Sequence, residues 1–140
     1  MHALTVAEAA DIALAGYYDA PNLDLLPWNQ ITASVMDMGW GAGPAQAIKL
    51  LQRMVGASDD GVISSATGET AKKYAAYLGP ATEPYLVTAA REYAVARNAF
   101  YDQIIAEHPA NARFRNGWRA RTASFLPGTA WWANWERAAA

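Results

Sequence analysis

The sequence of 140 residues contains no cysteine, which excludes disulfide bonds, cysteine-ligated metals and cysteine nucleophiles. Its two histidines, His2 and His108, lie far apart and form no HExxH spacing, so we expect no metal site. No Gly-Lys-Ser/Thr follows the glycines at 41–43, as a phosphate-binding loop requires. We therefore expect neither a metal nor an organic cofactor.

Charge is scarce as well. Charged residues make up 17% of the chain and the formal net charge is −2, so the sequence lacks the basic excess of a nucleic-acid-binding protein. No apolar run approaches the roughly 18 to 20 residues that span a bilayer. No basic start followed by an apolar segment indicates a signal peptide. We expect no nucleic-acid partner, no membrane span and no signal peptide of its own.

Apolar residues, in contrast, make up 53% of the chain and include six Trp and seven Tyr, enough for one domain with a buried core. They recur at helical spacing, which predicts an all-α fold. The helices are expected at residues 1–18, 28–38, 44–55, 67–78, 83–106 and 112–125. Only the stretch 59–65 predicts a short β-turn or hairpin. Its Asp59-Asp60-Gly61 lacks the alternating ligands and the final Glu of a calcium loop, so we interpret it as a structural turn.

The stretch from 37 to 67 organises the rest of the chain. Pro44 suits the first turn of a helix, and Gly56 suits its C-terminal cap. Leu51 lies on the apolar face of this helix and is expected in the core. The amide of Gln52, beside it, is expected to satisfy backbone groups of the adjoining loops.

This stretch resembles the phage-type N-acetylmuramidases of glycoside hydrolase family 108 and their associated peptidoglycan-binding segment. Nine positions here match the family pattern: Asp37, Gly43, Ala47, Leu51, Gln52, Asp60, Gly61, Ile63 and Thr67. Two flanking pieces agree in the right order, LTVAEAA through Tyr17-Tyr18 before it and Phe114, Gly117, Trp118 and Arg121 after it. The resemblance covers about residues 4 to 121 and implies a lysozyme-like helical bundle that binds the glycan strands of peptidoglycan. We expect this domain to comprise residues 1–125.

The departures from the family pattern are also informative. Gly41 stands where the family has Asn, and Ser64-Ser65 stands where it has Gly-Pro. The family's catalytic glutamate lies in an N-terminal Glu-Gly-Gly-Tyr segment, and no Glu-Gly-Gly occurs in this sequence. The resemblance thus implies the scaffold of a cell-wall lysozyme without its general acid. We predict no catalytic residue.

Five residues are predicted to contact the glycan: Asp37, Trp40, Tyr101, Trp118 and Arg121. Asp37 has an alternative interpretation as a hydrogen-bonded support for the glycine turn that follows it. Trp40 has one as a packing residue. Arg97 is expected to pair with Glu92, Asp102 or a neighbouring helix.

The chain ends in a tryptophan-rich segment, residues 126–140, predicted to be an attachment segment outside the helical domain. Pro127-Gly128 breaks the chain, and Trp131, Trp132 and Trp135 follow at once. Three such side chains do not all fit on one buried face of a short element, and aromatic residues concentrate at protein interfaces. We predict that they bind a partner protein or a second copy, with sugar stacking as the alternative.

Three hypotheses of function follow. The first is a peptidoglycan-binding or structural component derived from a phage muramidase scaffold, in a phage particle or lysis apparatus. The second is an active N-acetylmuramidase completed by a partner chain or by an unrecognised acid. The third is a purely structural virion protein. Their partners would be peptidoglycan and other phage or virion proteins, and their location the virion or, on delivery, the bacterial envelope (periplasm).

Overall fold

The computed structural model describes residues 5–130 and 132–133. Within these residues it contains helices and no strand, which confirms the all-α prediction. The elements are α1 (Val6–Leu14), the π-helical turn η1 (Ala15–Asp19), the 3-10 turn η2 (Leu23–Leu25), α2 (Gln30–Ala42), α3 (Pro44–Val55), α4 (Glu69–Leu78), α5 (Glu83–Glu107), the 3-10 turn η3 (Pro109–Phe114) and α6 (Arg115–Ala123). The stretch 59–65 is an irregular turn and not a hairpin.

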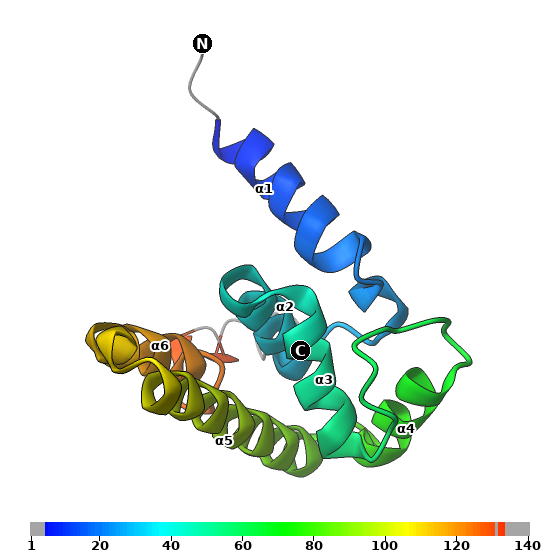
Figure 1. Ribbon diagram of the computed structural model, residues 1–140. Helices are drawn as coiled ribbons and strands as arrows, with labels where there is room; N and C mark the ends of the chain where they lie inside the picture. Colours follow the sequence, from blue (N-terminus) through cyan, green and yellow to red (C-terminus); the bar gives the residue numbers. More distant parts are fainter. Residues whose placement is uncertain (1–4, 131, 134–140) are drawn as a thin grey trace.

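The helices form a body from which α1 extends (Figure 1). Helices α2 and α3 pack against each other and against α5, while α6 lies on α5 and α4 contacts both α3 and α5. The core therefore sits between α2, α3, α4 and α5. In the described part of the chain, no helix combines the length and apolar character needed to cross a membrane.

Helix α3 begins and ends where the sequence predicts. Pro44 occupies its first turn, and Gly56 caps its end in the left-handed conformation with φ of 80°. Leu51 is fully buried. The sharp turn from α2 into α3 is made by Gly43, with φ of 95°, because Gly41 and Ala42 are still helical.

Gln52 joins α3 to the loop and helix that follow it. Its Nε2 lies 2.9 Å from Asp60 Oδ1, 3.0 Å from the Val62 carbonyl oxygen and 3.0 Å from Thr70 Oγ1. Its Oε1 accepts a hydrogen bond from the Gly61 N–H at 2.9 Å. The expected role of this amide is confirmed, and the carboxylate of Asp60 is used within the turn.

Helix α1 is not covered by the rest of the described chain. Thr5 caps it, accepting a hydrogen bond from the Glu8 N–H at 3.0 Å. None of its residues is buried, and Val6 is 90% exposed. Contact with the body begins at the turn after it, where the Tyr17 and Trp40 ring centroids are 4.7 Å apart.

The end of the described chain returns to the core. Trp132 is 3% exposed and belongs to the same apolar cluster as Leu51, with Leu126 packed against that cluster. Its burial corrects the expectation that this side chain is presented to a partner. Trp131 and Trp135 lie outside the described residues.

Candidate functional site

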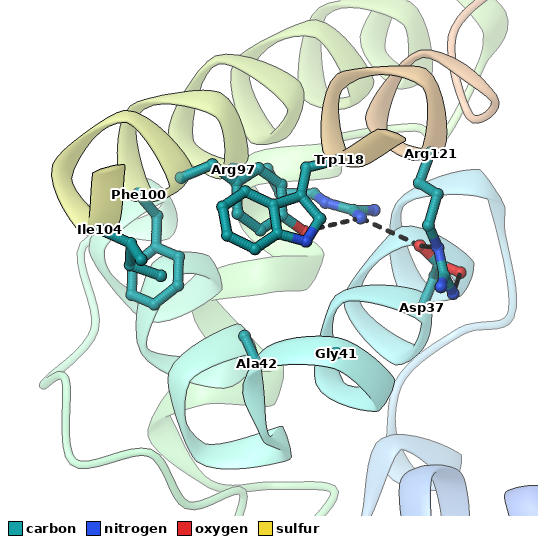
Figure 2. Close-up of a pocket in the computed structure, with 9 residues that line it drawn as sticks. Asp37, Gly41, Ala42, Arg97, Phe100, Ile104, Trp118 and Arg121 are labelled. Atoms are coloured by element: carbon teal, nitrogen blue, oxygen red, sulfur yellow. Dashed lines mark hydrogen bonds and ion pairs between the residues drawn. The ribbon is translucent and has the colours of Figure 1, made fainter. Parts of the chain in front are cut away.

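The candidate site is built on an aspartate that joins three helices. Asp37 of α2 accepts a hydrogen bond at Oδ2 from Arg97 Nη2 of α5, at 3.0 Å. The same carboxylate pairs with Arg121 of α6, whose Nη2 lies 2.5 Å from Oδ1 and whose Nε lies 3.3 Å from Oδ2. Two guanidinium groups therefore share one carboxylate (Figure 2).

Arg97 lies on the buried face of α5, one helical turn from both Tyr93 and Tyr101, and is only 1% exposed. Its Nη1 donates to Ser34 Oγ at 2.9 Å, and its Nη2 reaches the Tyr101 hydroxyl at 3.0 Å. Of the expected partners, Glu92, Asp102 or a neighbouring helix, the structure shows the last, because Arg97 bonds to Ser34 and Asp37 of α2. Its hydrogen bonds connect α5 to α2 within the buried interior.

Arg121 is the accessible member of the network, with half of its side chain exposed. The hydrogen bond with Asp37, more than the carboxylate's charge, raises the pKa of its guanidinium, so the side chain stays positive. Its Nε and Nη2 point at Asp37, and no described residue accepts a hydrogen bond from its Nη1. The Nη1 donors are therefore available to a ligand.

A cavity of about 140 Å³ opens on one side of the ion pair. Its charged end is formed by Asp37 and Arg121, and its apolar end by Phe100 and Ile104 (Figure 2). Trp118 lies between the two ends and stacks on Tyr101, with ring centroids 4.9 Å apart and an interplanar angle of 23°. The remaining lining residues are Gly41, Ala42 and Arg97.

A second hollow, of about 280 Å³, borders the same ion pair. It shares Asp37 and Arg121 with the first cavity, and its other lining residues are Tyr17, Trp28, Ala33, Met36, Trp40 and Phe125. Trp40 is 51% exposed here. The ion pair thus lines both hollows, and each hollow has aromatic walls.

The structure brings the five predicted glycan-contacting residues to this one place. Asp37, Tyr101, Trp118 and Arg121 line the first cavity, and Trp40 lines the second. Asp37 does not hold the glycine turn, as its alternative interpretation had it, but pairs with two arginines. Residues not singled out for this site from the sequence include Phe100, Ile104, Tyr17 and Phe125.

Comparison with known proteins assigns the family. The model of a family described as "Predicted Peptidoglycan domain" matches residues 46–123, more than half of the chain. The chain belongs to this family. A second model, Glycosyl hydrolase 108, matches residues 1–43 of this peptidoglycan-domain protein. These matches relate its function to peptidoglycan and to glycosyl hydrolases, in agreement with the sequence resemblance.

A solved structure, SagA of Brucella abortus, is also similar to this peptidoglycan-domain protein. The two are 28% identical and superpose with a TM-score of 0.64 over 88% of this chain. The chain spans 62% of the length of the SagA structure. Among curated proteins, none matches the sequence.

The boundary between the two family matches falls at the turn from α2 to α3, so the site uses residues from both matched segments. Asp37 and Trp40 belong to the segment that matches Glycosyl hydrolase 108. Arg97, Trp118 and Arg121 belong to the peptidoglycan-domain segment. The ion pairs of Asp37 therefore connect the two segments.

Proposed function

We propose that this chain binds the glycan strands of peptidoglycan across the two hollows that flank the Asp37–Arg121 ion pair. One observation carries the proposal: each hollow combines aromatic rings with the same exposed charged group. A sugar presents an apolar C–H face that packs on aromatic rings, and hydroxyl and amide groups that bond to charged side chains. A strand lying across this ion pair would place one sugar against Trp118 and another against Trp40.

The arrangement favours binding over acid catalysis. Glycosidases of most families place two carboxyl groups on either side of the bond that they cleave. Asp37 is the one acid among the residues that line the two hollows. Both of its oxygens already accept hydrogen bonds from guanidinium groups.

Removing the stacking surface should weaken binding without unfolding the chain. We expect Trp118→Ala to lower affinity for soluble glycan fragments of peptidoglycan by about tenfold or more, because interface tryptophans commonly contribute more than 1.4 kcal/mol. Isothermal titration and co-sedimentation with purified sacculi measure the loss. Thermal unfolding of each variant shows whether the fold is kept.

The matched control is Tyr85→Ala. Tyr85 is 49% exposed, close to the value for Trp40, but lies near the opposite end of α5 from Tyr101. The Tyr85→Ala variant should therefore bind glycan with the same affinity as the wild type. Equal losses in Trp118→Ala and Tyr85→Ala would mean that binding does not use the two hollows.

Hydrolysis of peptidoglycan is the second candidate function, favoured by the Glycosyl hydrolase 108 match over residues 1–43. A partner chain, or an acid remote from the hollows, would then supply the general acid. We expect the purified chain alone not to lyse chloroform-treated Gram-negative cells, because a positioned general acid contributes something like 10²- to 10⁴-fold in rate. A falling turbidity with the pure chain would establish the enzyme instead.

The cellular context that we propose is a phage particle or lysis apparatus, with delivery to the bacterial envelope. It is supported by the resemblance to phage-type muramidases. A purely structural place in the virion is the further alternative. Mass spectrometry of purified particles tests for incorporation, and sacculus binding by the purified chain then separates a binding component from a structural one.

A further inference from the structure

The site carries more positive than negative charge. Among the lining residues of both hollows, Arg97 and Arg121 are the cations and Asp37 is the one acid. The segment 109–130, which carries Trp118 and Arg121, contains four arginines and no acid in a chain of net charge −2. One of these, Arg119, is neutralised by Asp102, whose two oxygens lie 2.9 and 2.8 Å from its Nη2.

Arg121 has hydrogen-bond donors through which an anionic ligand could bind to this positively charged site. Its Nη1 has no acceptor among the described residues, and half of its side chain is exposed. A guanidinium binds a carboxylate through parallel N–H groups, and such charge-assisted hydrogen bonds are stronger than neutral ones. Arg97 is too buried to touch a ligand, but its charge, only partly offset by Asp37, adds to the attraction for an anion.

We infer that Arg121 binds a carboxylate of the peptidoglycan strand and so distinguishes muramyl glycan from neutral glycan. The inference rests on the proposed function and names the ligand group that the site selects. Arg121 lines both hollows, so a substituent on a sugar in either hollow would meet it. Muramic acid carries a lactyl group with a carboxylate, or a stem peptide with its own carboxylates, whereas N-acetylglucosamine carries neither.

The test compares three soluble ligands by isothermal titration. The first is a muramyl disaccharide with a free lactyl carboxylate, the second is the same disaccharide with its stem peptide, and the third is an uncharged N-acetylglucosamine oligomer. We expect the wild-type chain to bind at least one of the anionic ligands about tenfold or more tightly than the neutral one. Preference for the first ligand identifies the lactyl carboxylate, and preference for the second alone identifies the stem peptide.

Arg121→Gln should abolish this preference, because the loss of affinity for the anionic ligand should exceed any loss of affinity for the neutral oligomer about tenfold or more. Arg121→Lys keeps a positive charge without the guanidinium fork, so it should retain part of the preference. Arg119→Gln is the matched control, because this exposed arginine of the same helix is already paired with Asp102 and should leave the preference intact. Thermal unfolding confirms that each variant keeps the fold.

The outcomes distinguish a failure of the carboxylate inference from a failure of the proposed function. If the wild type binds charged and neutral glycans equally, or if Arg121→Gln weakens both to the same extent, the carboxylate inference is wrong and glycan binding stands. If the wild type binds none of the three ligands and no sacculi, the proposed function itself is wrong.

Discussion

Asp37→Ala should lower the free energy of unfolding by about 3–5 kcal/mol, the cost of leaving a buried charge without its partner. Arg97 is 1% exposed, and Asp37 is its ion-pair partner among the described residues. Removing the carboxylate leaves the Arg97 guanidinium in the core with only neutral acceptors, Ser34 of α2 and Tyr101 of α5. Urea denaturation measures the difference, provided that its m-value is unchanged.

Three further variants separate charge from packing. Asp37→Asn keeps an acceptor and isolates the contribution of charge. Arg121→Gln breaks only the half-exposed pair and should cost less than about 1 kcal/mol. Arg97→Met combined with Asp37→Ala removes both members of the pair and should recover part of the loss. If Asp37→Ala costs no more than Arg121→Gln, the Asp37–Arg97 pair does not stabilise the fold.

The features that sequence reasoning predicted correctly depend on local rules. Pro44 and Gly56 bound α3 because their backbone preferences act within one turn of helix. Gln52 was placed correctly because the acidic turn that it serves follows within ten residues.

The features that sequence reasoning missed depend on long-range contacts. Arg97 and Asp37 are 60 residues apart, and Arg121 and Asp37 are 84 apart, so helical spacing alone does not pair them. An arginine spaced four residues from Tyr93 and from Tyr101 was the available signal that Arg97 is buried. Periodicity predicted an apolar face for residues 1–18, but it does not tell whether the chain covers that face.

The candidate site was reached by resemblance more than by pattern. Trp118 and Arg121 were singled out because they match the family's ending, and Asp37 because it matches the position before the central helix. Their meeting in one cavity requires α6 to pack across α5 beside α2, a tertiary arrangement that no local signal encodes. Phe125 was not singled out for the site because it lies beyond the matched motif.

Trp132→Ala should lower the free energy of unfolding by about 3–5 kcal/mol, the usual cost of truncating a buried tryptophan. Trp132 is 3% exposed within the main apolar cluster. The turn before it is held by Thr129, whose hydroxyl lies 2.9 Å from the Ser124 and Leu126 carbonyl oxygens and 3.3 Å from the Trp132 N–H. The sequence suggested that residues 127–140 are dispensable for folding. The burial of Trp132 reverses that expectation.

Truncation after residue 126 should therefore lower the midpoint of thermal unfolding, as Trp132→Ala does. Deleting residues 1–14 is the control, because α1 has no buried residue and its loss should change the midpoint little. If the C-terminal truncation instead unfolds at the same temperature as the full chain, Trp132 contributes nothing to the core and the whole segment is free for attachment. If Trp132→Ala is destabilising but Trp131→Ala and Trp135→Ala only reduce self-association or incorporation into a particle, the segment has two parts. One tryptophan then anchors it to the domain, and the other two bind the partner.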